Sequence, residues 1–289
     1  MPFIEQWKHL GATRRLGAHD IFVIDRAAAD EQAEPVLLLH GFPTSSFDWR
    51  FQMQPLGETR RVLALDFVGF GLSAKPDQRY SLFEQADIVE ALVKELGVPE
   101  VALVTHDMGD SVGGEILARS LDEKLGFVVT RRVLTNGSIY LPLAQLTDGQ
   151  KMLLAMPDEA MAADDFSQEL IEAALAGTCA PGSVPPADQL VATAAFVTHD
   201  GGNRLLPRTI RYIEERRQHE SRWTGAIEFH PSPLEVIWGD ADPIAVWPMV
   251  EKLTAERPDV HVERLAGIGH YPMMEAPGAF TAALLRALA

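Results

Sequence analysis

Cysteine, basic side chains and long apolar runs are all scarce in this sequence. Its only cysteine, Cys179, cannot form an internal disulfide, and this favours a reducing, cytoplasmic compartment. The 25 lysines and arginines are outnumbered by 41 aspartates and glutamates, and the net charge of −16 disfavours nucleic acid and anionic membrane surfaces as partners. No run approaches the roughly 18 apolar residues of a membrane-spanning helix. We therefore expect a cytoplasmic protein that binds neither nucleic acid nor membranes.

Signatures of metal and cofactor binding are also missing. The sequence has no H-E-x-x-H motif and no pair of cysteines, so we expect no metal site. The segment GFGLSA (69–74) follows a strand-like run in the manner of a dinucleotide-binding fingerprint. Lys75 and Pro76 stand where the helix of that fingerprint would run, so we interpret the segment as a turn that Asp66 stabilises through backbone hydrogen bonds. No cofactor is expected.

Short runs of β-branched residues and leucine recur along the chain and predict strands. They cover residues 21–25, 35–41, 61–67, 101–106, 131–137, 234–239 and 260–267. From the third run onward strict alternation is lost, as expected for strands buried on both faces of a parallel sheet. Helical spacing of apolar residues marks 81–97, 109–121 and 277–288. The pattern predicts an α/β protein with a mostly parallel central sheet flanked by helices.

One long stretch, from about residue 139 to residue 230, contains no convincing strand. It holds helix-like segments at 149–161, 165–177 and 206–223, separated by a loop rich in proline and glycine. A helical insertion between two strands of one sheet accounts for this pattern. We therefore divide the chain into a first part of the core (1–138), an inserted helical cap (139–230) and a second part of the core (231–289).

The first candidate for chemistry is Asp107, which stands between the predicted strand 101–106 and the helix that follows. Small residues two positions to either side, Thr105 and Gly109, suit a sharp strand–turn–helix that lifts the central side chain above the sheet. The helix N-terminus then favours a negative charge there. The Phe42 amide, at the end of another strand, and the Met108 amide are candidates for an oxyanion hole. The alternative is that Asp107 only caps the helix.

Two further segments place polar side chains after the last predicted strands. WGDADPI (238–244) presents Asp240 and Asp242, and GIGHYPMMEAP (267–277) places His270 in a loop. The order Asp107, Asp242, His270 is that of nucleophile, acid and base in hydrolases built on this sheet topology. From position alone, Asp240 remains an alternative to Asp242.

These motifs resemble those of the α/β-hydrolases, in the aspartate-nucleophile branch that holds epoxide hydrolases and haloalkane dehalogenases. More narrowly, the chain is similar to the mesoderm-specific transcript proteins. The resemblance spans almost the whole chain and is carried by HGFPTSSFDW, LALDFVGFGLSAKP, SLFEQADIVEAL, THDMGDS, RYIEERR, RWTGAI and GHYPMMEAP. It implies an α/β-hydrolase fold with Asp107 as nucleophile, His270 as base and Asp242 rather than Asp240 as acid. Asn136 stands where some dehalogenases carry the acid, and an amide cannot serve in that role.

An aspartate nucleophile favours alkyl over acyl substrates. Its carboxylate is ionised at neutral pH without a base, and its attack on an epoxide or halide carbon gives a stable alkyl ester. Attack on an acyl carbon would give an anhydride instead. Water activated by His270 would then hydrolyse the ester while the Phe42 and Met108 amides hold the oxyanion. We therefore expect a hydrolase that uses water and a small hydrophobic substrate, with an epoxide favoured.

An epoxide requires an acid for its ring oxygen. Tyr212 resembles the second cap tyrosine of epoxide hydrolases, and packing is an equally good explanation for this residue. The first cap tyrosine has no clear match, and Tyr140, at the cap entrance, is the other possible donor.

A halide requires N–H donors, which the side chains of Met108 and Phe42 do not supply. Trp223 or Trp247 would then have to donate. Haloalkane dehalogenation is therefore the first alternative function. The second is a non-catalytic ligand-binding protein on a hydrolase scaffold, although a binder has no need of His270.

Overall fold

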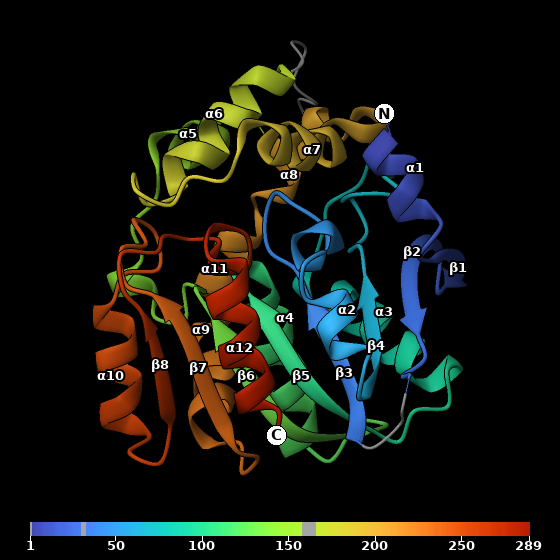
Figure 1. The fold of residues 1–289 in the computed structure, drawn as a ribbon, viewed down its shortest axis with the longest axis vertical. Helices are drawn as coiled ribbons and strands as arrows, with labels where there is room; N and C mark the ends of the chain where they lie inside the picture. The colour runs from blue at the N-terminus through green and yellow to red at the C-terminus, as the bar shows by residue number, and fades with distance from the viewer. Residues whose placement is uncertain (1, 30–32, 158–165) are drawn as a thin grey trace.

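The computed structural model describes residues 2–29, 33–157 and 166–289, and its centre is an eight-stranded sheet (Figure 1). The strands lie in the order β1-β2-β4-β3-β5-β6-β7-β8. β2 pairs antiparallel with both β1 and β4, and the remaining pairs are parallel. The strands are β1 (Ala12–Leu16), β2 (His19–Arg26), β3 (Ala33–Leu39), β4 (Arg60–Leu65), β5 (Glu100–His106), β6 (Val128–Thr135), β7 (Leu234–Gly239) and β8 (His261–Leu265). The predicted mostly parallel sheet is confirmed.

All seven predicted strands are present, and β1 is an additional strand that the sequence analysis missed. Its sequence ATRRL has a single buried residue, Leu16, because β1 lies at the edge of the sheet. The apolar run that marks the other strands is therefore absent. β1 joins β2 in a hairpin at Gly17, whose φ of 58° is a conformation that glycine adopts without steric cost.

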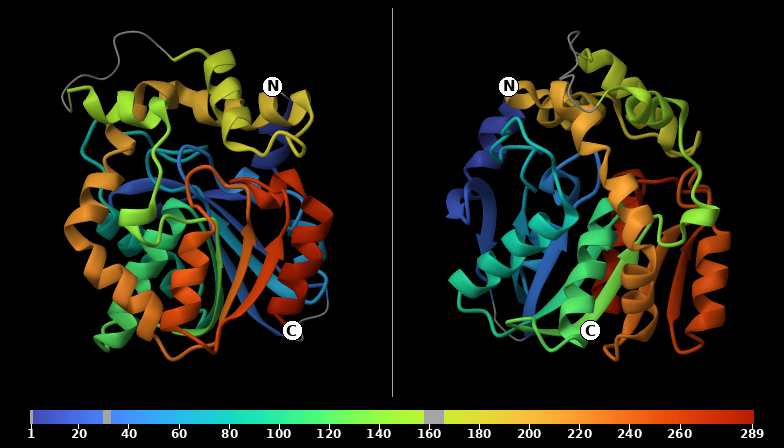
Figure 2. Two further views of the ribbon diagram at one scale, coloured as in Figure 1. Left: turned by 90° about the vertical axis from the view of Figure 1, so that its left-hand side faces the viewer. Right: turned by 180° about the vertical axis from the view of Figure 1, so that it is seen from behind.

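Helices cover both faces of the sheet. α3, α4 and α9 pack side by side on the face seen from behind in Figure 2. α2 and α12 lie on the other face, where Gln52, just before α2, donates to Thr281 in α12 at 3.0 Å. The helices of the core are α1 (Pro2–Lys8), η1 (Ser46–Trp49), α2 (Met53–Leu56), α3 (Leu82–Glu95), α4 (Met108–Leu121), α10 (Pro248–Glu256), α11 (Pro272–Glu275) and α12 (Pro277–Ala287). Two covered faces explain why the strands lack alternation.

A helical layer between β6 and β7 lies over the carboxyl edge of the parallel strands (Figures 1 and 2). It comprises η2 (Leu141–Leu143), α5 (Asp148–Ala155), α6 (Gln168–Thr178), α7 (Ala187–Thr198), η3 (His199–Leu205), α8 (Leu206–Thr209) and α9 (Tyr212–Phe229). None of the described residues from 139 to 230 belongs to a strand. The sequence analysis missed α7, which follows the proline-rich loop, and residues 158–161 of one predicted helix lie outside the described residues.

The helix α9 belongs partly to the cap and partly to the core. It begins at Tyr212, under the cap, and runs down the sheet beside α4, where Trp223 is buried against Gly114. A Cβ at Gly114 would lie 2.9 Å from the Trp223 Cβ, so the two helices are in close contact. The range 139–230 therefore contains a helix that connects the cap rigidly to the sheet.

The segment 69–74 is a turn, as predicted. Asp66 accepts hydrogen bonds from the amides of Ser46 (2.8 Å) and Leu72 (2.7 Å), and a Cβ at Gly71 would meet the Asp66 carboxylate. Within the described part of the chain, no helix is long and apolar enough to cross a membrane. Over the same residues, no group of three or more His, Cys, Asp or Glu side chains is placed to hold a metal ion.

The stability of the sheet can be tested at β3. Leu37 is fully buried, and Leu37→Ala should lower the free energy of unfolding by about 3 kcal/mol, because it removes buried methyl groups and leaves a cavity. Leu121→Ala is the matched control: this side chain is 46% exposed, and its loss should change the value by less than about 0.5 kcal/mol. Urea denaturation measures both variants, and equal effects would contradict the described core.

Candidate functional site

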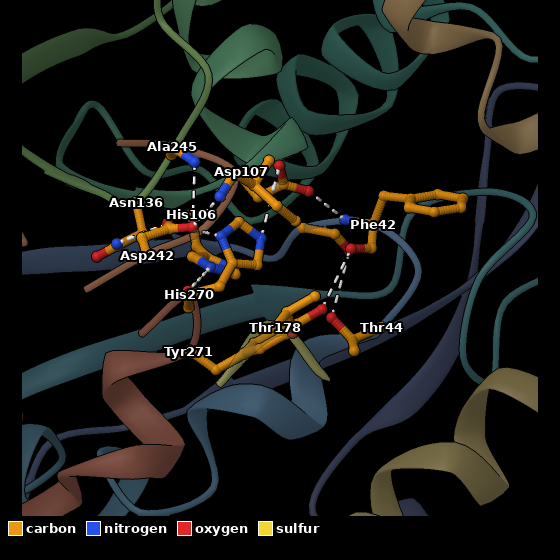
Figure 3. Close-up of polar contacts among 12 residues, drawn as sticks. Phe42, Thr44, His106, Asp107, Asn136, Thr178, Asp242, Ala245, His270 and Tyr271 are labelled. Carbon is orange, nitrogen blue, oxygen red and sulfur yellow. Dashed lines mark hydrogen bonds and ion pairs between the residues drawn. The ribbon is translucent and has the colours of Figure 1, made fainter. Parts of the chain in front are cut away.

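Asp107 lies at the sharp turn between β5 and α4 (Figure 3). Its φ of 51° and ψ of −113° fall in a region that costs roughly 1–3 kcal/mol for a residue with a side chain. The side chain makes no capping hydrogen bond to α4. Its Oδ2 instead accepts a hydrogen bond from the Phe42 amide at 2.8 Å. The strained turn therefore aims the carboxylate at the loop after β3, and the helix-cap interpretation does not describe its main contact.

Glycines allow the two strand ends to approach this closely. A Cβ at Gly109 would lie 2.6 Å from the carbonyl oxygen of Leu39, and one at Gly41 would lie 2.6 Å from the Asp107 Cβ. On the strand side of the turn, Thr105 fits because a Cβ at Gly113 would meet its methyl group at 2.9 Å. Three glycines therefore make room for the turn. Gly109 belongs to the motif at 105–109, whereas Gly41 and Gly113 lie outside it.

The Phe42 amide donates to the Asp107 carboxylate, and the Met108 amide, at the start of α4, also favours the ionised form and lowers the pKa of that group. The loop that carries the Phe42 amide is held by His40. The His40 Nδ1–H donates to the Gly41 carbonyl (2.8 Å), and its Nε2 accepts from the Phe67 amide (3.0 Å). Burial lowers the pKa of His40, so the ring stays neutral and can accept as well as donate. A neutral imidazole thus fixes the direction of the Phe42 amide.

His270 and Asp242 come from two other loops and complete a buried cluster with Asp107. The His270 Nδ1 lies 2.8 Å from the Asp242 Oδ2, and its Nε2 lies 3.9 Å from the Asp107 Oδ1. The second oxygen of Asp242 accepts from the amides of Ile244 (2.7 Å) and Ala245 (3.0 Å). Asp240, the alternative acid, instead binds Arg264 at 2.7 Å. The structure brings together the three residues that the sequence order suggested.

The charges of this cluster shift the pKa of each member. Burial alone would lower the pKa of His270, but the nearby carboxylates, Asp242 above all, outweigh it and raise the pKa to about 9. Burial raises the pKa of Asp107, and the charge of His270 opposes that rise. Burial also disfavours ionised Asp242, yet the charge and hydrogen bonds around it hold its pKa below the ordinary value. At neutral pH the imidazole is therefore protonated.

Two residues outside the predicted site hold this cluster in place. The Asn136 amide donates to the Asp242 Oδ2 at 2.8 Å, and its Oδ1 accepts from the Gly239 amide at 2.9 Å. The His106 Nε2–H donates to the carbonyl of His270 at 2.8 Å. Burial lowers the pKa of His106 to about 3, so this ring is neutral. The sequence signal for both residues was their position: His106 ends β5 directly before Asp107, and Asn136 follows β6, which pairs with β5.

An apolar cavity of about 160 Å³ lies between the cap and the cluster. Phe42, His270 and Tyr271 form its inner end, and most of the wall comes from α5, α6 and the loops beside them. The other lining residues are Pro43, Thr147, Gly149, Gln150, Met152, Leu153, Phe166, Leu170, Ile171, Ala174, Leu175, Thr178, Leu206 and Ile244. An apolar cavity of about 150 Å³ can hold a benzene molecule, so the space suits a small hydrophobic ligand.

The two candidate tyrosines occupy different places. Tyr212 is buried with its ring 5.8 Å from that of Phe42, and burial followed by the charge of Asp107 raises its pKa, which keeps the hydroxyl protonated. The Tyr140 hydroxyl instead donates to Glu228 at 2.7 Å, and neither tyrosine is among the residues that line the cavity. The structure therefore places Tyr212 near Asp107 and turns the Tyr140 hydroxyl toward α9.

The two candidate tryptophans are also away from the cavity. The Trp223 indole N–H donates to Glu115 at 2.9 Å, and the ring of Trp247 is covered by the Arg264 guanidinium, 4.6 Å from its centre. Neither residue lines the cavity. No described contact makes either indole available to a leaving halide beside Asp107.

Comparisons with known proteins agree with this architecture. Residues 36–284 match the alpha/beta hydrolase family. The chain is 38% identical to LipZ of Mycobacterium tuberculosis H37Rv over 99% of this chain and 98% of that protein. It is 34% identical to the mesoderm-specific transcript protein of Mus musculus over 96% and 86% of the two chains. The solved haloalkane dehalogenase DbeA of Bradyrhizobium elkani USDA94 is similar in fold, with a TM-score of 0.78 at 21% identity over 96% and 97% of the chains.

The electrostatic coupling in the cluster predicts the effect of neutralising Asp107. In Asp107→Asn the pKa of His270 should fall below its value of about 9, because one of the carboxylates that favour the protonated ring is removed. Titration of the imidazole nitrogens by NMR measures this change. Asp240→Asn is the control, since that carboxylate binds Arg264 instead, and it should leave the His270 titration unchanged. A pKa that is the same in Asp107→Asn and wild type would refute the coupling.

Proposed function

Since the chain belongs to the alpha/beta hydrolase family, we propose that it is an epoxide hydrolase that opens a small hydrophobic epoxide through a covalent ester on Asp107. The observation that carries this proposal is a buried carboxylate at the strained turn, within hydrogen-bonding reach of two amides and 3.9 Å from a histidine. A carboxylate in this position favours attack on an sp³ carbon, because the product is a stable ester that the histidine can help to hydrolyse.

In the first step an Asp107 oxygen forms a bond to an epoxide carbon, and the ring carbon–oxygen bond breaks. Oδ1 suits this attack, because Oδ2 is held by the Phe42 amide. The ring oxygen takes the hydroxyl proton of Tyr212, which becomes a tyrosinate. Its place beside Phe42 and its protonated state at neutral pH support Tyr212 as this acid.

In the second step water attacks the Asp107 Cγ and gives a proton to the His270 Nε2. The separation of 3.9 Å between Nε2 and Oδ1 is too long for a direct hydrogen bond, which supports a water molecule acting between them. The Phe42 and Met108 amides hold the oxyanion that forms on Oδ2. When the ester bond breaks, the alkoxide takes the proton from His270, and the proton of the new carboxyl group returns to the tyrosinate. The sum is epoxide plus water to diol.

The pKa of His270 supports this order of steps. In the free protein the negative charge of Asp107 helps to keep the ring protonated, and a protonated imidazole cannot act as a base. Formation of the ester removes that charge, so the pKa of His270 falls and the ring gives its proton to solvent before water attacks. When hydrolysis restores the Asp107 carboxylate, the ring takes a proton back from solvent and the cycle closes. The base therefore becomes available after the nucleophile has reacted, which is when it is needed.

The leaving group favours an epoxide over a halide. Tyr212 offers an O–H donor near Asp107, whereas the indoles of Trp223 and Trp247 are engaged elsewhere. The side chains of Phe42 and Met108 cannot donate a hydrogen bond. The apolar lining of the cavity and its volume of about 160 Å³ support a small hydrophobic substrate.

Trapping of the ester tests the proposal directly. His270→Gln should accumulate a covalent adduct on Asp107 with styrene oxide and none with 1-bromobutane, because attack does not need the base whereas hydrolysis does. Intact mass followed by peptide mapping detects the adduct and its position. Asp107→Asn with the same reagents is the control and should remain unmodified.

The remaining outcomes decide between the alternatives. A butyl adduct with no styrene oxide adduct would replace the proposal with dehalogenation. No adduct over a broad panel of epoxides and halides, with no turnover by the wild type, would replace it with ligand binding on a hydrolase scaffold.

The assignment of the acid predicts a selective loss. Tyr212→Phe should lower kcat/KM for styrene oxide about 100-fold or more, the usual size of general-acid catalysis. Tyr140→Phe should have little effect on kcat/KM, since its hydroxyl binds Glu228. Steady-state kinetics measure both variants. Equal losses in the two variants would contradict the role of Tyr212.

A further inference from the structure

Glu275, in the short helix α11, connects the cap to the loop that carries His270. Its Oε2 accepts hydrogen bonds from the Gly269 amide (2.8 Å), the Ala180 amide (3.0 Å) and the Ser183 hydroxyl (2.5 Å). Its Oε1 accepts from the Tyr271 amide (2.8 Å). One carboxylate thus receives two donors from the loop on either side of His270 and two donors from the segment that follows α6.

The same two segments also make direct contact. The His270 amide donates to the Thr178 carbonyl at 3.1 Å. A Cβ at Gly269 would lie 2.4 Å from the Ala180 nitrogen and 2.9 Å from the Cys179 Cα, so a side chain there would prevent this approach. Residues 178–183 of the cap and residues 269–271 of the core therefore pack as one unit, with Glu275 between them.

Four donors directed at one side chain suit a carboxylate. A carboxylate offers two oxygens that only accept, and hydrogen bonds to an ionised acceptor are roughly twice as strong as those between neutral groups. A glutamine amide would keep one oxygen and turn an N–H₂ group toward donors, which leaves partly buried N–H groups without an acceptor. The arrangement is therefore sensitive to a change that barely alters the shape of the side chain.

We propose that Glu275 is a positioning residue for His270, and that its carboxylate holds the base over Asp107 by tying the His270 loop to cap residues 178–183. This inference rests on the proposed function, because it uses the two-step reaction. His270 takes part in the hydrolysis of the ester and not in its formation. Loss of the Glu275 carboxylate therefore slows the second step and leaves the first almost unchanged.

The two steps separate in the kinetic constants. When ester formation is irreversible, kcat/KM reports that first step, whereas kcat includes the hydrolysis. With styrene oxide, Glu275→Gln should lower kcat about 10- to 100-fold, the size of effect expected when a reacting group is displaced by a fraction of an ångström to an ångström. KM should fall with it, so that kcat/KM stays within about twofold of wild type. Quenched samples should contain the Asp107 adduct at steady state.

Two further variants give the comparison its controls. Ser183→Ala removes one cap donor and keeps the charge of Glu275, so it should lower kcat by less and in the same step. Glu263→Gln removes an equal charge from β8, where Glu263 pairs with Arg286 at 3.1 Å, and should leave both constants unchanged. Thermal unfolding verifies that each variant is folded at the assay temperature. If Glu275→Gln is unfolded at that temperature, Ser183→Ala alone tests the inference.

The outcomes distinguish this inference from the proposed function. If His270→Gln accumulates an adduct but neither Glu275→Gln nor Ser183→Ala slows the hydrolysis of that adduct, the positioning role is wrong and the reaction stands. If Glu275→Gln slows formation of the adduct and its hydrolysis by the same factor relative to wild type, Glu275 has a structural role only. That result also overturns the inference. If His270→Gln accumulates no adduct with any substrate, both proposals fail together.

Discussion

Burial of three ionisable side chains in one place is the constraint on which the site depends. Asp107, Asp242 and His270 are each at most 4% exposed, and an isolated buried charge would be prohibitively costly. The cost is offset by the opposite charges themselves and by backbone amides, which donate to both carboxylates. The strained backbone at Asp107 is kept by the same network, because relaxing it would separate the carboxylate from its donors.

The carboxyl edge of the parallel sheet makes this network possible. Asp107 follows β5, Asp242 follows β7 and His270 follows β8, while the Phe42 amide follows β3. Adjacent parallel strands end side by side, so loops far apart in the chain meet above the same edge. Neutral His40 and His106 lie beneath these loops and satisfy their backbone groups, so the cluster is supported from below as well as from the sides.

The cap covers the buried cluster and also contacts the loops that carry it. α9 places the Tyr212 ring beside that of Phe42 and then packs along α4, which fixes that tyrosine relative to the turn at Asp107. The segment after α6 contacts the His270 loop through Glu275. The cavity under the cap is apolar and reaches His270. The walls of the cavity and the contacts to the His270 loop thus come from the same layer.

Features of the fold were predictable when they depended on residues close together in the sequence. Seven strands were predicted because a strand covered on both faces must be apolar along its length, which is a local property. β1 was missed because an edge strand needs only one buried residue, Leu16. α7 was missed because the prolines before it resemble a loop, although its apolar face is buried in the cap.

The sequence by itself predicted the strand–turn–helix at Asp107 and the α/β sheet, because a turn and a strand each depend on residues close together in the chain. It also placed Asp107, Asp242 and His270 after predicted strands, in the order that suggested the candidate site. Only the tertiary structure showed that Asp242 contacts His270 while Asp240 binds Arg264, turned the Tyr140 hydroxyl to Glu228, and gave Asn136, His106 and Glu275 their partners. Those contacts join residues up to 164 positions apart. Their distances follow from how the loops meet at the sheet edge, and no local pattern in the chain encodes that meeting.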